Sequence, residues 1–197
     1  MIEMDLDLLK KLIEAYGISG QEQEVRNIIA RELKGFVDAV YVDKFGNLIA
    51  HKKGSAPRVM LAAHMDEIGL IVSKIDNKGR IYFSTVGTIE SLALMGQRVH
   101  ISVGKRAIHG VITTIEFNDG KTIKALPTIE DMFIEVGLTK EELEKKGVEV
   151  GSYVALEQET GFLGKEEIIY GKALDDRIGC FILIELAKKL RKARNET

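Results

Sequence analysis

The sequence contains no tryptophan, one cysteine and two prolines among its 197 residues. The single cysteine, Cys180, excludes a disulfide within the chain, and its apolar neighbours favour a buried, unreactive thiol. No apolar run approaches the roughly 20 residues that a membrane-spanning helix needs. The N-terminal segment lacks the basic start and the apolar centre of a secretory signal. We therefore expect a cytoplasmic protein without a membrane partner.

A strong net charge is also lacking. The 28 lysines and arginines nearly balance the 30 aspartates and glutamates, which leaves a formal net charge of -2. Such a balance gives no strong field to attract a phosphate backbone, so we expect no nucleic-acid partner. Hydrophobic residues make up 45% of the chain, enough to fill the core of one large domain or of two small ones.

The N-terminal quarter predicts two helices followed by a hairpin. Two stripes of apolar residues at helical spacing indicate the two helices within residues 9–35. Ser19, followed three residues later by Glu22, resembles a capping box at the start of the second helix. The β-rich runs 37–42 and 47–51 flank a glycine-containing turn, which predicts an antiparallel hairpin.

A short apolar run next leads to the first candidate functional residues. Residues 58–63 are continuously apolar after the first and too few for a helix, which indicates a strand covered on both faces. His64 and Asp66 follow it directly, where strands of open α/β sheets border a ligand crevice. An imidazole there can bind a metal while a carboxylate orients the ring from behind. Taken alone, the pair His64 and Asp66 is as compatible with a structural histidine as with a metal ligand.

The pattern of predicted secondary structure changes after His64 and Asp66 and returns to an α/β pattern near the end of the sequence. Short β-like runs broken by turn signals fill the middle of the chain. A strand at 168–170 and a helix at 178–193 then resume an α/β pattern. We therefore expect a discontinuous α/β domain of residues 1–67 and 166–197, interrupted by an inserted β-rich domain of residues 68–165.

The turn before the last helix carries a second candidate group, Asp175, Asp176 and Arg177. Acidic residues before a helix are commonly caps. Adjacent side chains of extended chain point in opposite directions, so one aspartate could bind a metal while the other braces the turn. Because both groups follow strands of one discontinuous sheet, an imidazole and a carboxylate could together begin a metal pocket.

Several segments in a fixed order resemble one family. They are the opening GISGQEQEVRNIIARELK, VDKFGNLIAHKKG (42–54), AAHMDEIGLIV (62–72), GKALDDRIGC (171–180), and DMFIEVGLTKEELEKKGVEVGSYV within the expected insertion. Together they are similar to the M42 family of metallo-aminopeptidases, which includes glutamyl, deblocking and tetrahedral aminopeptidases. The likeness runs over essentially the whole chain.

The resemblance implies a fold, a site and a reaction. The fold would be a phosphorylase/hydrolase-like α/β metallopeptidase domain, incomplete here, interrupted by a PDZ-like dimerisation domain. The site would hold two divalent metal ions, zinc or cobalt, with His64 binding one and Asp175 bridging both. Asp66 would act in catalysis by orienting His64, and Asp176 would sit at a strained peptide. The substrate would be a peptide that loses its N-terminal residue, and the subunits would form dimers or dodecameric tetrahedra.

The family pattern continues beyond the helix at 178–193 with a Glu-Glu pair, a further acidic ligand and a histidine ligand that the 197 residues do not contain. The remaining histidines, His51, His100 and His109, lack paired ligand spacing, so we expect them to be structural or solvated. A catalytic zinc usually has three protein ligands. The expectation is therefore a chain that is inactive alone.

Two alternatives stay open. One is a non-catalytic oligomerisation or assembly module of the same fold. The less favoured one is a glycoside hydrolase of the endoglucanase kind, which would need two carboxyl groups roughly 5 to 9.5 Å apart across a sugar bond. Neither acidic motif requires that spacing, and aromatic residues for sugar stacking make up only 6% of the chain.

Overall fold

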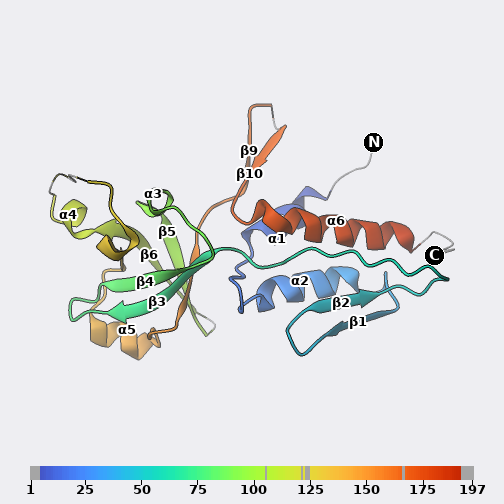
Figure 1. The fold of residues 1–197 in the computed structure, drawn as a ribbon, viewed down its shortest axis with the longest axis horizontal. Coiled ribbons are helices and arrows are strands. Elements are labelled where there is room, and N and C mark those ends of the chain that lie inside the picture. The colour runs from blue at the N-terminus through green and yellow to red at the C-terminus, as the bar shows by residue number, and fades with distance from the viewer. Residues whose placement is uncertain (1–4, 105, 121, 123–124, 166, 192–197) are drawn as a thin grey trace. The chain divides into compact units, whose positions relative to one another are not determined.

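The computed structural model describes residues 5–104, 106–120, 122, 125–165 and 167–191. The chain packs into two compact units, one of Met1–Glu67 with Thr160–Thr197 and one of Ile68–Glu159 (Figure 1). The elements are of mixed α/β class. Within the described residues, no helix is long and apolar enough to cross a bilayer.

Three helices build the core of the first unit: α1 (Leu6–Glu14), α2 (Gln23–Leu33) and α6 (Leu174–Leu190). Asp5 caps α1 by accepting a hydrogen bond from the backbone N–H of Leu8 at 3.0 Å. The apolar stripes of the three helices meet in one core, whose members include Leu12, Ile13, Val25, Ile28, Phe181 and Ile184.

The capping box expected at the start of α2 is wrong. Glu22 is the N-cap residue, and no side chain makes a capping hydrogen bond there. The Glu22 carboxylate instead accepts a hydrogen bond from the backbone N–H of Gly20 and forms an ion pair with Arg26 at 3.3 Å. The reason is that the Ser19 hydroxyl is used elsewhere, as a donor to Asp66.

Two short antiparallel hairpins complete the first unit. The expected N-terminal hairpin is confirmed, with β1 (Ala39–Val42) paired to β2 (Leu48–His51). The second hairpin pairs β9 (Gly161–Leu163) with β10 (Ile168–Tyr170). Each of these sheets has two strands, so the described part of this unit contains no multi-stranded parallel sheet.

The buried strand expected at residues 58–63 is wrong. The segment is extended but unpaired, and Val59, Met60 and Leu61 are 73%, 89% and 55% exposed. A strand needs hydrogen-bonding partners beside it, and none of the described residues pairs with this segment. The chain rejoins the core at Ala63, which packs against the helices.

The second unit is a closed six-stranded barrel of antiparallel neighbours in the order β3-β4-β7-β6-β5-β8. Its strands are β3 (Gly69–Ile75), β4 (Ile81–Val86), β5 (Arg98–Val103), β6 (Arg106–Thr114), β7 (Met132–Glu135) and β8 (Tyr153–Leu156). Closure removes the unpaired edges that an open sheet would present. Alternate side chains fill the interior, among them Leu70, Val72, Ile81, Val99, Ile101, Ile112 and Ile134.

Short helices lie in the connections between the barrel strands: α3 (Ser91–Leu94), α4 (Ile115–Asn118), the 3-10 turn Ile129–Asp131 and α5 (Lys140–Lys146). In α5, Thr139 and Glu142 form a reciprocal capping box, and Gly147 ends the helix at a φ of 88°. Leu143 from α5 packs into the barrel core, so this helix covers one end of it.

The barrel core predicts the effect of one truncation. Ile134 is fully buried and lies opposite both Ile81 and Ile112 in the ladder. We expect Ile134→Ala to lower the free energy of unfolding by about 2–5 kcal/mol, because it leaves a cavity among fixed strands. The exposed Val150→Ala should change it by about 0.5 kcal/mol or less. Urea denaturation followed by circular dichroism compares the two, and equal effects would contradict this account of the core.

Candidate functional site

Two remote segments meet around the imidazole of His64. His64 Nε2 lies 2.9 Å from Oδ1 of Asp175, although 111 residues separate them in the sequence. On the other side of the ring, Nδ1 lies 3.0 Å from Oδ1 of Asp66. The structure therefore brings together all three residues that the sequence marks out, with the imidazole between two carboxylates.

The Asp175 end of this group is open to solvent. The side chain of Asp175 is 95% exposed and that of His64 is 54% exposed. Asp66 is held from behind, because the Ser19 hydroxyl donates a short hydrogen bond to its Oδ2. Sequence reasoning missed Ser19 because it interpreted that residue as a helix cap. Ser19, Asp66, His64 and Asp175 thus form a row of side chains in contact, and both of its ends, Ser19 and Asp175, are exposed.

The two carboxylates raise the pKa of His64 above its ordinary value of 6.5. Burial alone lowers this pKa, but hydrogen bonds to Asp175 and Asp66, and the negative charges of both, outweigh the burial. The cationic ring is therefore favoured when no metal is present. A metal ion would have to displace that proton, because a ligating imidazole nitrogen must be unprotonated.

The neighbouring aspartate has a separate task. Asp175 and Asp176 both have non-helical backbone angles, and the peptide bond between them is cis. Asp176 Oδ1 accepts a hydrogen bond at 3.0 Å from the backbone N–H of Gly179. A Cβ atom at Gly179 would lie 2.3 Å from the same oxygen, so a larger residue there would displace the Asp176 carboxylate. Asp176 therefore braces the start of the regular helix while Asp175 faces His64.

A buried charged network joins the segments that carry the site. The carboxylate of Glu67, next to Asp66 in the chain, accepts hydrogen bonds from Lys172 Nζ at 2.7 and 2.8 Å and from the Gly17 backbone at 2.9 Å. Arg177 is 0% exposed and has its NH2 group 3.7 Å from Glu67. One carboxylate thus contacts both ends of the turn that holds Asp175.

The two cations of this network also bind the end of α1. Arg177 donates to the backbone carbonyls of Leu12 and Ala15 at 2.6 and 3.0 Å, and Lys172 donates to Ala15 at 3.2 Å. Lys172 also lies over the ring of Tyr16, 4.5 Å from its centroid. Burial lowers the pKa of Lys172, and the charge of Glu67 opposes that shift.

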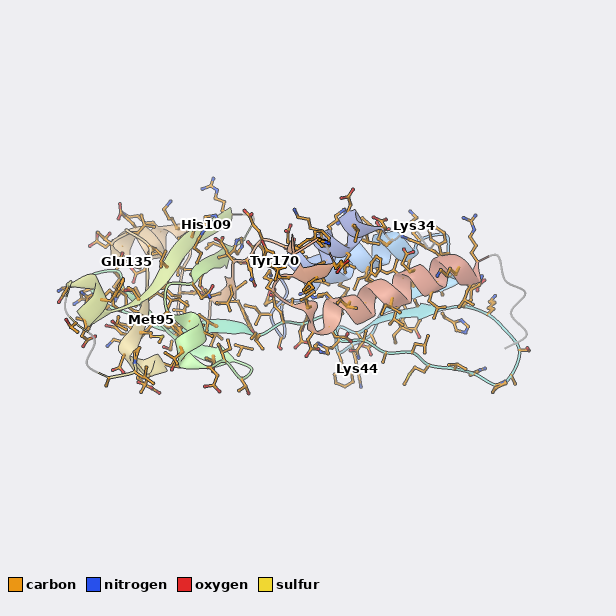
Figure 2. The ribbon with its side chains drawn as sticks, turned by 90° about the horizontal axis from the view of Figure 1, so that it is seen from above. Lys34, Lys44, Met95, His109, Glu135 and Tyr170 are labelled. Atoms are coloured by element: carbon orange, nitrogen blue, oxygen red, sulfur yellow. The ribbon has the colours of Figure 1, made fainter. Side chains whose placement is uncertain are left out.

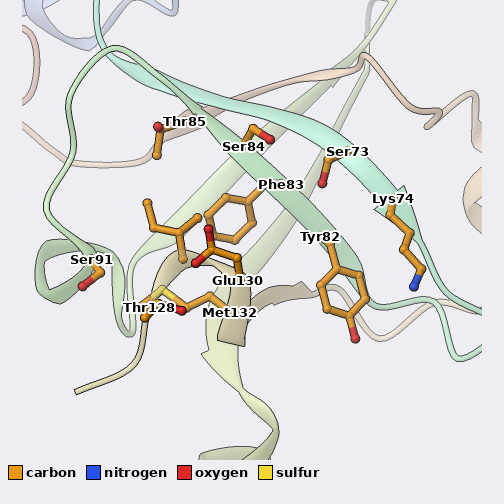
Figure 3. Close-up of a pocket in the computed structure, with 11 residues that line it drawn as sticks. Ser73, Lys74, Tyr82, Phe83, Ser84, Thr85, Ser91, Thr128, Glu130 and Met132 are labelled. Carbon is orange, nitrogen blue, oxygen red and sulfur yellow. The ribbon is translucent and has the colours of Figure 1, made fainter. Parts of the chain in front are cut away.

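The described residues of each unit also line a hollow. In the first unit, a space of about 1010 Å³ is lined by His64 and Asp66 together with mainly apolar side chains of β2 and α6. In the barrel, a hollow of about 670 Å³ lies over β3 and β4, with Lys74, Tyr82 and Glu130 on its walls (Figure 3). The barrel hollow includes none of the predicted site residues, whereas the first includes two.

Sequence reasoning missed one further cluster. His51 is exposed on β2, but His100 and His109 are opposite each other on β5 and β6, with Glu157 beside them. Their spacing in the sequence carries no ligand motif, because the pair arises from the register of a hairpin. The sequence feature that could have indicated this pair is a histidine in each of two neighbouring β-rich runs.

Comparisons with known proteins identify the family of this chain. The family model described as M42 glutamyl aminopeptidase matches residues 46–197. The chain belongs to the M42 peptidase family. M42 aminopeptidases are generally metal-dependent hydrolases.

Known members of the M42 family match nearly the whole chain. It is 38% identical over its entire length to a putative aminopeptidase of Acetivibrio thermocellus, and it covers 57% of that protein. A TET aminopeptidase from the marine sediment archaeon Thaumarchaeota archaeon SCGC AB-539-E09 superposes with a TM-score of 0.87 at 36% identity, over 94% of this chain and 53% of that one.

The TET1 peptidase of Pyrococcus horikoshii superposes with a TM-score of 0.86 at 32% identity, over 96% of this chain and 57% of that one. That peptidase can assemble into a tetrahedron or a large octahedral shell. The chain spans little more than half the length of these M42 relatives.

The network around Glu67 predicts a large cost when its charge is removed. We expect Glu67→Gln to lower the free energy of unfolding of the first unit by about 3–5 kcal/mol, because two buried cations lose their shared partner. Glu32→Gln removes only a partly exposed ion pair with Lys188 and should cost less than about 1 kcal/mol. Urea denaturation measures both, and similar costs would show that the network does not hold the unit together.

The raised pKa of His64 predicts a pH-dependent contribution to the stability of the metal-free chain. A base whose pKa is higher in the folded state stabilises that state fully below the unfolded pKa, here near 6.5, and the contribution is lost as pH rises through the folded pKa. The wild-type chain should therefore exceed His64→Gln in melting temperature at acidic pH, and the difference should shrink in alkali. A difference that grows with pH would contradict the assigned direction.

Proposed function

We propose that this chain supplies the His64 and Asp175 side of a dinuclear metal site in an aminopeptidase that removes N-terminal residues from peptides. The observation that carries the proposal is the 2.9 Å approach of His64 Nε2 to Asp175 Oδ1. Membership of the M42 family supports it, since the matched relatives are aminopeptidases. This chain covers little more than half the length of each relative. The aminopeptidase activity of the whole protein is therefore also proposed here.

The donor atoms suit divalent metal ions. An imidazole nitrogen and a carboxylate oxygen converge, and both are ligands that zinc and cobalt accept. We propose that His64 binds one of two such ions and that Asp175 bridges the pair. When bound, the ions would polarise the scissile carbonyl and lower the pKa of a water molecule.

The residues of the chain would position these ligands. In the tautomer that donates Nδ1–H to Asp66, His64 directs the lone pair of Nε2 toward Asp175. Asp66 is kept in place by the Ser19 hydroxyl and thereby fixes the ring, which is the common arrangement behind a ligating histidine. Asp66 therefore acts in the proposed reaction as a positioning residue.

The described residues offer fewer ligands at His64 than a catalytic site needs. In the part of the chain that the structure describes, only one group of three converging ligand atoms occurs, and it lies in the barrel. A catalytic zinc usually has three protein ligands and an open position. We therefore propose that the 197 residues alone are inactive and that the reaction requires ligands from outside them.

Assembly is the second function that a specific observation favours. A similar solved peptidase forms tetrahedra and octahedral shells. We propose that this chain also self-associates, as a dimer or a dodecameric tetrahedron, through the barrel as an inserted PDZ-like dimerisation domain. The barrel carries exposed apolar side chains suited to an interface, such as Phe117 on α4 and Leu92 on α3.

Glycoside hydrolysis is less favoured by the same geometry. A glycosidase needs two carboxyl groups that flank a gap for the sugar bond. Asp66 and Asp175 instead contact the two nitrogens of one imidazole ring, so His64 fills the space between them. The arrangement is typical of a metal ligand and the group that orients it.

The proposal predicts which activity appears when the chain is extended. We expect the 197-residue chain to release no amino acid from peptides, with zinc or cobalt present. A fusion that adds the C-terminal part of the Acetivibrio thermocellus relative should release N-terminal residues in a metal-dependent manner. In that fusion, Asp175→Asn should lower kcat/KM by about 100-fold or more, because it removes a bridging ligand.

A matched control separates this effect from a loss of negative charge. Asp7 lies in the first turn of α1, and Asp7→Asn in the same fusion should leave kcat/KM within about twofold. Broadening of the His64 ring signals by cobalt in NMR spectra gives a readout apart from turnover. Metal-dependent release by the 197 residues alone, or full activity in the Asp175→Asn fusion, would contradict the proposal.

A further inference from the structure

Three potential metal ligands gather on the outer surface of the barrel. His100 on β5 and His109 on β6 are direct cross-strand partners, with ring centroids 5.8 Å apart and nearly perpendicular planes. Glu157 follows β8, the neighbour of β5 on its other side, and its backbone N–H donates to Arg98 at 2.9 Å. One ligand atom from each of the three lies within 4.8 Å of the others.

The strand pattern directs these side chains outward. Val99 and Ile101, on either side of His100, are fully buried in the barrel core. Because successive side chains of a strand point to opposite faces, His100 points to the surface. Ile108 packs against the same core, which places His109 on the outside (Figure 2).

We propose that His100, His109 and Glu157 bind one divalent transition-metal ion, with Zn²⁺ as the best match. Two imidazoles and one carboxylate form a common zinc ligand set. This site belongs to the barrel and shares no residue with the group at His64 and Asp175. It would leave the fourth tetrahedral position to water.

The geometry needs only side-chain adjustment to hold the ion. Ligand atoms about 2.1 Å from a tetrahedral zinc lie roughly 3.4 Å from one another. The His109 side chain is 61% exposed and can rotate, whereas the Glu157 side chain is 10% exposed and fixed. The two histidines are held in register by paired strands, so the backbone would not have to move.

Arg98 orients the carboxylate rather than blocking it. Its NH2 group lies 3.1 Å from Oε2 of Glu157, while Oε1 contacts Nδ1 of His109 in a short hydrogen bond. Glu157 can therefore keep Arg98 on one oxygen and offer the other to a metal. Such a partner behind a carboxylate ligand is common in metal sites.

The alternative is a metal-free ion cluster in which Glu157 only pairs with Arg98 and His109. The two interpretations differ in whether zinc binds with saturation and whether both histidines are required. To isolate the barrel cluster, zinc binding is measured by isothermal titration calorimetry in the full chain carrying His64→Gln and Asp175→Asn. Visible absorption of bound Co²⁺ then reports the coordination of the same site.

We expect this background chain to bind one Zn²⁺ with saturation. His100→Gln and His109→Gln should each weaken the affinity by about 10-fold or more, because each removes one of three ligands. His51→Gln, an exposed histidine on β2, should leave the affinity unchanged. Circular dichroism checks that each variant remains folded.

The absence of saturable zinc binding in the background chain would overturn the proposal. A zinc affinity of the His109→Gln variant equal to that of the background chain would also overturn it. So would a loss of zinc affinity in His51→Gln as large as that in His109→Gln. None of these outcomes bears on the peptidase proposal, because the background variants already lack its ligands.

Discussion

Glu67 places one buried carboxylate against two buried cations, Lys172 and Arg177, and through them against the end of α1. Asp66 and His64 precede Glu67 in the chain, and Asp175 lies between the two cations, so every residue of the candidate site is within a few positions of this network. A buried charge without a partner is costly, which makes any rearrangement that separates these segments unfavourable. The positions of the site residues follow from that constraint.

The residues that hold the site together are buried, whereas the proposed metal ligand Asp175 is exposed to solvent. Arg177 and Glu67 are buried and paired with each other, while Asp175 is almost wholly exposed and contacts the ring of His64. This division suits a metal site, since ligands must be held in place yet open toward the ion and the substrate. Asp176 and Gly179 add a local brace, which separates the structural task of one aspartate from the ligand task proposed for the other.

The hydrophobic pattern marked His64, Asp66 and Asp175 as candidate residues because each lies beside a change in that pattern. His64 follows an apolar run, and Asp175 lies in the first turn of α6, ahead of its apolar residues. The pattern was not sufficient for residues 58–63, since a strand depends on neighbours that periodicity does not reveal. Ser19 was misassigned for a related reason: a local capping motif was outweighed by a contact with Asp66, 47 positions away. The cluster of His100, His109 and Glu157 depends on strand register, which spacing alone does not encode.

The central claim is that His64 and Asp175 share a metal ion. A crystal structure of the zinc-loaded fusion that adds the C-terminal part of the Acetivibrio thermocellus relative, with anomalous scattering collected at the zinc edge, tests it most directly. The account predicts an anomalous peak within bonding distance of both His64 Nε2 and a carboxylate oxygen of Asp175, with Asp66 still on Nδ1. A map with no peak at that position, or with the two side chains turned away from each other, would contradict it.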